Sequence, residues 1–503
     1  MEVEEKISAG EAVFERWRNT MGLFLGPLVF SAILFIPFTD LTGPAHRLLA
    51  IVSLVIIFWI TEALPIPVSA LLGATLCIIL GVEEEKKVLS SFANPIIFLF
   101  MGSFMIAHSM RLHRLDQRLA YFILSRKKLA SSFRGVVAAM AGACAFVSMW
   151  ISNTATAAMA FPIALGIVSS LSESIPEKTN ISALRISLLL MVAYASSIGG
   201  IATPVGTPPN LIGLGMIETI LGRNITFFGW MILAIPLAIA TLGILLLLFK
   251  LMFRIQKQNL AGLAEQVRTK RENLGSWSRG EKNTLVAFLT AVTLWVFPGM
   301  VALVSGTSSK FYQLYNSKIP EAVAALVAAS LLFILPVSWK KREFTLDWKE
   351  AVKIDWGTIL LFGGGLTLGS LMFSTGLAEK IGQWILSLTG ASSLWTITLI
   401  SIATAVLISE TTSNTASASM VVPVMIGVAQ SAGVSPLPPA LGATLGASFG
   451  FMLPVSTPPN AIVYSSGFIP ITRMIRTGIM LDLIGIAVIW LGLRLLCPFL
   501  GLV

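Results

Sequence analysis

Apolar runs of roughly 20 residues recur from one end of the chain to the other, with short polar segments between them. This is about the length that a helix needs to cross the hydrocarbon core of a bilayer. The runs lack the alternation of apolar and polar residues that marks a membrane β-barrel. The clearest runs are Met21–Pro37, Leu48–Trp59, Ile96–Ala107, Trp230–Leu251, Asn283–Val304, Ala322–Val337 and Ile479–Leu496. The pattern therefore predicts an all-α membrane protein.

Composition supports this class, because 55% of the 503 residues are hydrophobic and only 12% are charged. Soluble domains carry about 25% charged residues. The segment Met1–Thr20 is charged and amphipathic, so we expect an uncleaved first span from about Met21 rather than a cleavable signal peptide. The three cysteines and three histidines show no metal-ligand spacing. We interpret the net charge of +10 as a topology signal and expect no nucleic-acid partner.

Most of the 35 Lys and Arg residues gather in a few polar segments, which the positive-inside rule assigns to the cytoplasm. These segments are Lys6–Arg18, Arg111–Arg134, Lys250–Lys282, Lys340–Lys353, and Arg473 with Arg476. All of them fall on one side only if residues 135–167 and 394–428 enter and leave the membrane on the same face. We therefore expect about eleven transmembrane helices plus two re-entrant hairpins, with the N-terminus cytoplasmic and the C-terminus outside.

Two short motifs occur twice in the chain, in the same order. The sequence of Ser152–Thr154 returns as Ser413–Thr415, and Thr207–Asn210 returns as Thr457–Asn460, about 250 to 260 residues later. A weaker match relates residues 114–124 to residues 376–386. An odd number of spans separates the two units, so the second copy enters from the opposite face. The sequence therefore predicts inverted repeats, between which secondary transporters hold their substrate near the midplane.

The repeat divides the chain into four parts. Residues 1–45 form an N-terminal cytoplasmic segment and the first span, and residues 251–282 form a cytoplasmic connecting segment with a surface helix. The first inverted repeat is expected over residues 46–250 and contains the hairpin 135–167. The second is expected over residues 283–503 and contains the hairpin 394–428.

The Thr-Pro-Pro-Asn motif breaks a helix, because proline lacks the N–H group and clashes with the preceding turn. Backbone groups freed in this way are tolerated inside a membrane where they line a cavity or bind a ligand. A half-helix that begins at the break directs its N–H groups toward an anion. Free carbonyl and hydroxyl oxygens suit a small hard cation such as Na+. One such polar cluster is usually interhelical glue, but symmetric pairs of breaks indicate a substrate site.

At these residues the sequence resembles the divalent anion/sodium symporter family, and the resemblance extends from about Phe38 to Val503. It implies a homodimer in the bacterial inner (plasma) membrane. It also implies an elevator mechanism, in which a transport domain with both hairpins moves against a scaffold domain. The implied activity is Na+-coupled uptake of four-carbon dicarboxylates such as succinate, malate or fumarate, with about two or three Na+ per substrate.

The resemblance also implies roles for individual residues. The substrate would bind Ser152, Asn153, Thr154, Ser413, Asn414 and Thr415, with Thr207, Pro208, Thr457 and Pro458 nearby. The first Na+ site would use Ser148, Ser152, Asn153 and Gly206. The second would use Ser409, Thr412, Asn414 and Ser456, with backbone carbonyls as the expected ligands at Thr412 and Ser456. For Glu410, a rare membrane acid, the role stays open between organising the hairpin, serving a nearby cation and relaying protons.

Other functions remain as alternatives at this point. The chain could exchange dicarboxylates without Na+, or it could be a citrate or sulfate symporter of the same family. An enzyme would need titratable groups that converge on a pocket, and no His, Cys or acid pair recurs at the symmetric breaks. A channel would not need two inverted hairpins. We therefore expect a secondary transporter and no enzymatic activity.

Overall fold

The computed structural model describes residues 9–125, 132–174, 181–253, 263–306 and 308–503. Lys6, Arg126, Lys127 and Lys128, which belong to two of the expected cytoplasmic segments, lie outside the described residues. So do residues 254–262 of the expected connecting segment. The described chain is almost entirely helical, as expected, with one short antiparallel strand pair, β1 (Pro336–Ser338) and β2 (Glu343–Phe344).

The described helices of the first half follow one another in chain order from Ala9 to Met252. They are α1 (Ala9–Phe35), α2 (Gly43–Thr61), α3 (Ile66–Ile79), α4 (Glu85–Ser90), η1 (Ser91–Ala93), α5 (Pro95–Leu112), α6 (Leu115–Leu124), α8 (Phe133–Ser148), α9 (Asn153–Ser174), α10 (Ile181–Gly200), α11 (Pro208–Leu221) and α12 (Phe227–Met252). Helix α13 (Leu263–Glu272) lies in the expected connecting segment and is the surface helix predicted there.

The second half repeats this order. Its helices are α14 (Arg279–Ser305), α15 (Lys310–Lys318), α16 (Glu321–Ile334), α17 (Trp348–Ala351), α18 (Trp356–Ser374), α19 (Leu377–Thr389), α20 (Leu394–Thr411), α21 (Asn414–Ser431), α22 (Leu437–Gly446), η2 (Pro454–Ser456), α23 (Pro458–Tyr464) and α24 (Ile471–Phe499). Helices α2, α3 and α5 correspond to α14, α16 and α18, and the pair α8–α9 corresponds to α20–α21. The broken span α10–α11 corresponds to α22–α23, and α12 corresponds to α24.

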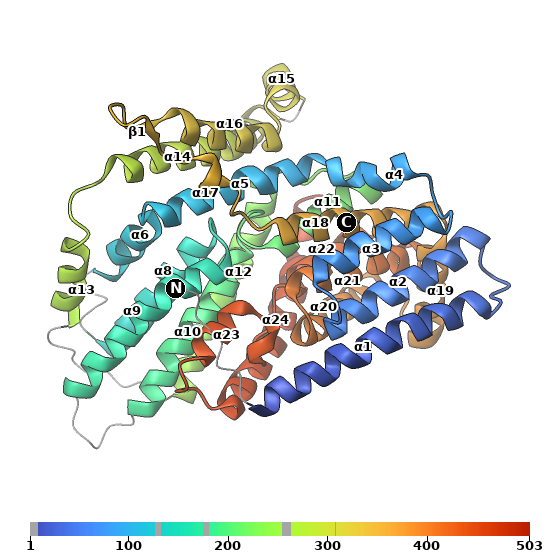
Figure 1. The fold of residues 1–503 in the computed structure, drawn as a ribbon, viewed down its shortest axis with the longest axis horizontal. Helices are drawn as coiled ribbons and strands as arrows, with labels where there is room; N and C mark the ends of the chain where they lie inside the picture. Colours follow the sequence, from blue (N-terminus) through green and yellow to red (C-terminus); the bar gives the residue numbers. More distant parts are fainter. Residues whose placement is uncertain (1–8, 126–131, 175–180, 254–262, 307) are drawn as a thin grey trace.

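Contacts between the halves are reciprocal. Helix α5 packs on α16 and α18 packs on α3, while α10 contacts α23 and α22 contacts α11. Small residues let these backbones approach each other closely, as is common between membrane helices. A Cβ atom added at Gly102 of α5 would lie 2.7 Å from Ala325 of α16, and one at Gly364 of α18 would lie 2.7 Å from Ala70 of α3. Each half therefore covers surfaces of the other, and their helices mix in space (Figure 1).

Several expected spans are short or interrupted. Among the described residues, nine helices are long and apolar enough to cross a membrane, and the bent pair α15–α16 makes a tenth. Helix α3 and helix α16 have only 14 residues each. The expected tenth span is divided into α22 and α23. The division of the tenth span lies at the Thr-Pro-Pro-Asn motif, where Pro458 begins α23.

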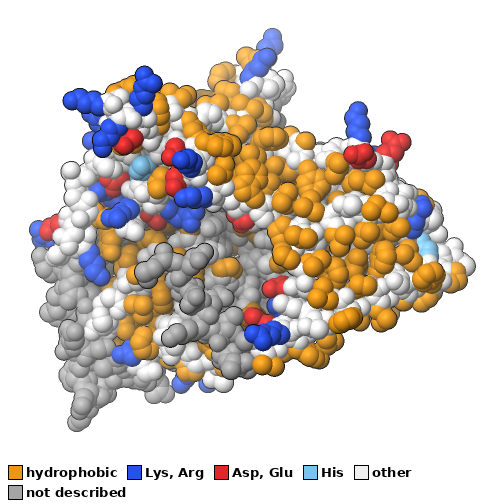
Figure 2. Space-filling view, in the orientation of Figure 1, with side chains coloured by type: hydrophobic (Ala, Val, Ile, Leu, Met, Phe, Trp, Pro, Cys, Tyr) orange, Lys and Arg blue, Asp and Glu red, His pale blue; other side chains and the backbone are white. Residues whose placement is uncertain are grey.

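Both expected hairpins are present as helix pairs. The first is α8–α9, which turns between Ser148 and Asn153, and the second is α20–α21, which turns between Thr411 and Asn414. Figure 2 shows a broad apolar area on one face of the molecule, with charged side chains mostly toward its margins. Side chains such as Phe24, Leu28 and Phe35 of α1 are exposed. This surface is the one expected of a protein surrounded by lipid.

Candidate functional site

The two Thr-Pro-Pro-Asn motifs begin half-helices, as their prolines predict. Pro208 is the first residue of α11 and Pro458 is the first residue of α23, where the missing N–H group costs nothing. Thr457 caps α23, because its side chain accepts a hydrogen bond from the backbone N–H of Asn460 at 3.3 Å. Thr207 occupies the equivalent cap without a side-chain bond. The first break is buried and the second is partly so, and the freed backbone groups that lie away from the surface need partners inside the protein.

The motif asparagines supply those partners. The Nδ2 group of Asn210 donates to the carbonyl oxygens of Gly200 at 3.0 Å and Thr203 at 2.8 Å. The Nδ2 group of Asn460 donates to the carbonyl oxygens of Gly450 at 2.9 Å and Leu453 at 3.0 Å. Both asparagines are fully buried. They were part of the recognised motifs, yet sequence reasoning assigned them no role; their identical position in both motif copies was the available signal.

The tip of the first hairpin carries a serine–asparagine pair. The Ser148 hydroxyl donates to Oδ1 of Asn153 at 2.7 Å, and both side chains are buried. Ser152 lies between them in the sequence, and its hydroxyl accepts a bond from the N–H of Ala155 at 3.3 Å at the start of α9. Thr154 is exposed. The hydroxyl of Ser148 therefore fixes the orientation of the asparagine amide.

The second hairpin repeats this arrangement. The Ser409 hydroxyl is 2.7 Å from Oδ1 of Asn414, and Ser413 caps α21 by accepting from the N–H of Ala416 at 3.2 Å. Thr415 is half-buried. The Ser409 hydroxyl also lies 2.8 Å from the carbonyl oxygen of Ala447, in the break after α22. The hairpin tip and the broken span are therefore joined directly.

Oxygen atoms converge around the residues expected at the first cation site. A Cβ atom at Gly206 would lie 2.9 Å from the carbonyl oxygen of Ser148 and 2.5 Å from that of Gly200. A Cβ atom at Gly200 would lie 2.1 Å from Oδ1 of Asn153. Only glycine fits at these two positions without displacing oxygen atoms. The structure thus brings Ser148, Asn153 and Gly206 together, with Gly200, which sequence reasoning did not name, packed against them.

The equivalent residues of the second half also meet. A Cβ atom at Gly450 would lie 3.3 Å from the carbonyl and hydroxyl oxygens of Ser409 and from Cβ of Ser456. The hydroxyl of Thr412 donates to the carbonyl oxygen of Trp59 at 2.9 Å, at the end of α2. That bond uses the single proton of the hydroxyl and ties the tip of the second hairpin to α2.

Glu410 holds the second break in shape. Its carboxyl group accepts from the backbone N–H groups of Met452 at 2.9 Å and Leu453 at 3.3 Å, and from the hydroxyl of Ser456. The side chain is 2% exposed. These bonds tie the end of α20, the first helix of the second hairpin, to the second break. Asp482 of α24, a second buried acid, lies close enough to interact with it.

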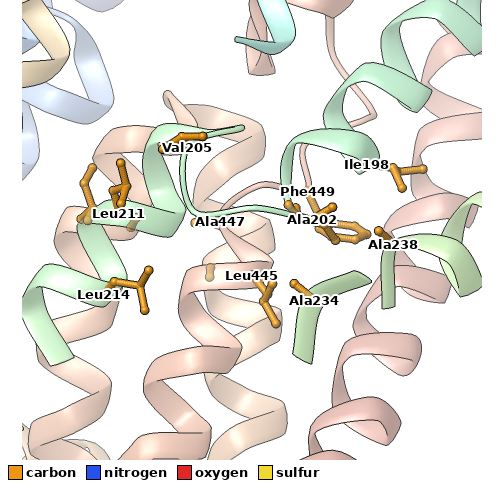
Figure 3. Packing of buried hydrophobic residues seen from close by; sticks show 14 of the residues in the cluster. Ile198, Ala202, Val205, Leu211, Leu214, Ala234, Ala238, Leu445, Ala447 and Phe449 are labelled. Carbon is orange, nitrogen blue, oxygen red and sulfur yellow. The ribbon is translucent and has the colours of Figure 1, made fainter. Parts of the chain in front are cut away.

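Hydrophobic packing brings the two breaks together. Figure 3 shows Ala202 and Val205 of the first break in the same cluster as Ala447 and Phe449 of the second, with Ala234 and Ala238 of α12 nearby. The hydroxyl of Tyr194 in α10 donates to the carbonyl oxygen of Phe451 at 2.9 Å. The breaks therefore form one packed unit drawn from both halves.

A cavity of about 360 Å³ opens beside the second break. This volume lies within the range of small-molecule pockets, about 300–1,000 Å³. Its walls include Ser413, Ser456, Thr457 and Pro458 of the predicted site. The opposite wall comes from α1 and the corner between α2 and α3, through Arg18, Glu62 and Ile66. The cavity thus exposes the second motif pair, whereas the first pair does not line it.

Comparison with known proteins gives the same family as the motifs. A family model described as the sodium:sulfate symporter transmembrane region matches residues 18–503. A relative called sodium-dependent dicarboxylate transporter SdcS, from Staphylococcus saprophyticus, is 34% identical over 487 residues, covering 95% of this chain and 91% of the relative. The protein of the same name from Staphylococcus aureus is 34% identical over 484 residues, with the same coverage.

Two solved structures share the fold. The YdaH transporter of Alcanivorax borkumensis has a TM-score of 0.53 and 16% identity, covering 97% of this chain and 98% of the other. MtrF of Neisseria gonorrhoeae has a TM-score of 0.53 and 13% identity, covering 92% and 96%. With the family match over nearly the full length, the resemblance seen in the motifs is confirmed: the chain belongs to the sodium:sulfate symporter family of multi-pass membrane transporters.

Proposed function

We propose that the protein is a secondary active transporter that carries four-carbon dicarboxylates such as succinate, malate or fumarate into the cell together with Na+. The observation that carries the proposal is the matched pair of oxygen clusters. Ser148–Asn153 and Ser409–Asn414 have the same 2.7 Å contact, each at a hairpin tip next to a helix break. The similarity to sodium-dependent dicarboxylate transporters supports this reading.

The substrate chemistry follows from the helix ends. Helices α9, α11, α21 and α23 all begin at the motifs, and α9 packs on α23 while α21 packs on α11. The N-terminal ends of helices carry partial positive charge and free N–H groups, which favour carboxylates. Hydroxyl and amide groups of Ser152, Thr154, Ser413 and Thr415 would hold the two ends of the dianion. A small dicarboxylate matches this twofold arrangement of donors.

Two Na+ ions would bind in the two oxygen clusters and move with the substrate. Bringing a dianion into a cell with a negative interior costs about 2.3 kcal/mol per charge for each 100 mV. Two Na+ ions cancel the charge of the dianion, and a third would make transport electrogenic. We therefore propose two or three Na+ per substrate.

Movement would follow the elevator mechanism in a homodimer of the bacterial plasma membrane. Both hairpins and both broken spans would travel together, because the substrate contacts groups from all four. The spans near residues 21–81 and 283–337 would form the scaffold and stay fixed against the partner protomer. The shared packing of the two breaks supports a single moving unit (Figure 3).

Uptake into proteoliposomes tests the function. The purified protein should accumulate labelled succinate when a Na+ gradient points inward, and the initial rate should rise sigmoidally with Na+ because at least two cations bind. Choline in place of Na+ should abolish uptake, and empty liposomes give the background. Full uptake in choline buffer refutes Na+ coupling.

A Na+-independent dicarboxylate exchanger is the second candidate, since that alternative also needs the anion-binding helix ends. Counterflow in Na+-free buffer separates the two: vesicles loaded with unlabelled succinate would take up labelled succinate only if the protein is an exchanger. Competition by citrate and by sulfate in the same assay tests the remaining substrates of the family.

A further inference from the structure

The wall of the cavity opposite the second motif contains a charged pair. Nη2 of Arg18 in α1 lies 3.2 Å from Oε2 of Glu62, which follows α2. Both residues line the cavity, together with Ser413, Thr457 and Pro458. Arg18 is the only cationic side chain among the described residues that line it. A dianion in this cavity would therefore meet one guanidinium group, beside the carboxylates of Glu15 and Glu62.

The guanidinium group is held in place and retains unused donor capacity. Its side chain is 17% exposed, compared with 42% for Glu62, and its Nε atom is buried without a hydrogen-bond partner. An arginine presents five N–H donors in a planar fork that matches a carboxylate. The ion pair with Glu62 uses Nη2 alone, and the buried Nε does not face the cavity. The N–H groups of Nη1 and the second N–H of Nη2 are the donors that suit a second carboxylate.

Neighbouring contacts fix α1 against the corner after α2. The Asn19 amide, in the orientation that satisfies it, donates to the carbonyl oxygens of Thr61 at 2.7 Å and Glu15 at 3.1 Å. A Cβ atom at Gly22 would lie 1.9 Å from Oγ1 of Thr61, so α1 and α2 approach as closely as glycine permits. Glu62 has a φ of +51°, a conformation that non-glycine residues rarely adopt. This local geometry directs the Glu62 carboxylate to Arg18.

We propose that Arg18 is a carboxylate-capture site at the mouth of the substrate cavity, and that Glu62 occupies it as an internal carboxylate until a dicarboxylate displaces it. The inference rests on the proposed function, because it takes the dicarboxylate as the ligand. The proposed capture site is distinct from the predicted substrate-binding site, which is built from hydroxyl, amide and backbone groups. When the cavity holds no anion, Glu62 pairs with the Arg18 guanidinium group, which would otherwise be a largely buried charge without a partner.

Substitutions of the two members of this ion pair should change the affinity for the dicarboxylate in opposite directions. Replacing Arg18 removes the cation that binds the substrate carboxylate and lowers the affinity. Replacing Glu62 removes the carboxylate that competes for Arg18 and raises the affinity. A salt bridge that only stabilised the fold would give losses of the same sign for both changes. If the ion pair were a gate that closes the cavity, either substitution would increase the leak of succinate across the membrane. Opposite changes in affinity for the two substitutions therefore distinguish a capture site from a structural salt bridge and from a gate.

The experiment measures exchange of labelled succinate with equal Na+ on both sides, in inverted and in right-side-out membrane vesicles that contain the full chain. At the face where the cavity opens, Arg18→Gln should raise the half-saturating succinate concentration about tenfold, as for loss of one charge-assisted hydrogen bond. Glu62→Gln should lower it about threefold, and this gain should vanish in the double variant. Arg18→Lys keeps the charge without the fork and should fall between Arg18→Gln and the wild type.

Arg16→Gln is the matched control, because Arg16 lies on the same helix, is exposed, and does not line the cavity. Equal shifts at both faces, shifts of the same sign for the two partners, or a Glu62→Gln gain that survives without Arg18 would each overturn the proposal. If Arg18→Gln does not fold, Arg18→Lys and Glu62→Gln still show whether the half-saturating succinate concentration rises for one partner and falls for the other. Absence of any exchange by the wild type instead refutes the proposed function, so the two failures are distinguishable.

Discussion

A hydroxyl group that donates to an asparagine oxygen determines how each hairpin tip can bind ligands. In Ser148–Asn153 and in Ser409–Asn414 the bond leaves the Nδ2 group of the asparagine directed away from the serine. The amide can then face a carboxylate through its nitrogen and a cation through its oxygen. One side chain thus serves two ligands of opposite charge, which links substrate binding to cation binding at the level of a single residue.

Asn153→Ala and Asn414→Ala should therefore each reduce Na+-driven succinate uptake at least about 100-fold, because two polar contacts worth about 1–3 kcal/mol each are lost together. The fold should persist, since helices α9 and α21 keep their serine caps. Purified variants in proteoliposomes give the rates, and size-exclusion chromatography confirms folding. Asn224→Ala, at an exposed residue bonded to Glu218, is the control and should transport normally. Near-normal uptake by either site variant contradicts the assignment of these residues.

Gly200 tests the first oxygen cluster without removing a polar group. In Gly200→Ala the new Cβ atom would lie 2.1 Å from Oδ1 of Asn153 and would displace it, an overpacking that typically costs about 1–3 kcal/mol. We expect a higher half-saturating Na+ concentration and a lower uptake rate. Gly142→Ala in α8 is the matched control, because a Cβ atom there meets no atom within 4 Å. The idea fails if both alanine variants behave alike.

At the scale of elements, each broken span depends on a single asparagine side chain. Asn210 bonds the carbonyl groups of Gly200 and Thr203 across the break between α10 and α11, and Asn460 bonds those of Gly450 and Leu453 across the break between α22 and α23. Without these bonds the carbonyl groups would be buried and unpaired. The asparagines thus give an irregular segment a defined shape inside an apolar environment.

Asn210→Ala and Asn460→Ala should each lower the apparent unfolding temperature in detergent, because leaving a buried carbonyl unpaired costs about 1–3 kcal/mol. Intrinsic tryptophan fluorescence during heating reports the transition. Transport should fall with stability, since the carbonyl groups held by Asn210 also border the first oxygen cluster. Unchanged unfolding temperatures for both variants would show that water or neighbouring groups replace the amide.

Local pattern was enough to predict most of the membrane-spanning helices, both hairpins and the half-helices that begin at the two Thr-Pro-Pro-Asn motifs. Periodic apolar runs, proline pairs and repeated Ser-Asn-Thr sequences act over a few residues, so their consequences are visible in the chain. The contact of Arg18 with the cavity that contains Ser413 was not predictable, because the two residues are far apart in sequence and meet only after both halves pack. The hydrogen bond from Tyr194 to Phe451 was not predictable for the same reason, because it too joins residues from different halves of the chain.

At the scale of the whole molecule, the hydroxyl of Thr412 joins the second hairpin to α2 through the carbonyl oxygen of Trp59. An elevator would move this hairpin relative to α2, so the bond must break in each transport cycle. Thr412→Val removes about 0.5–1.5 kcal/mol that favours the present arrangement. The maximal uptake rate should therefore change by about twofold or more, with little change in the half-saturating succinate concentration.

Thr411→Val provides the comparison for that rate measurement, because Thr411 is exposed and bonds only within its own helix, to the carbonyl oxygen of Ile408 at 3.0 Å. It should leave both kinetic parameters unchanged. If Thr412→Val lowers thermal stability but not the maximal rate, the hairpin and α2 belong to one rigid unit. The division into a scaffold and a moving domain would then be wrong.

The reciprocal packing of the two halves also affects how the protein is made. Ribosomes add about 5–20 residues per second, so the first motif is complete roughly 10–50 seconds before its counterpart about 250 residues later. During that interval α3, α9 and α11 lack the second-half helices that cover them. The polar segments at the starts of α9 and α11 are then without the second-half groups that pack on them, and their burial waits for the second half. A chain cut short in the second half would therefore be a substrate for membrane proteases rather than a half-active transporter.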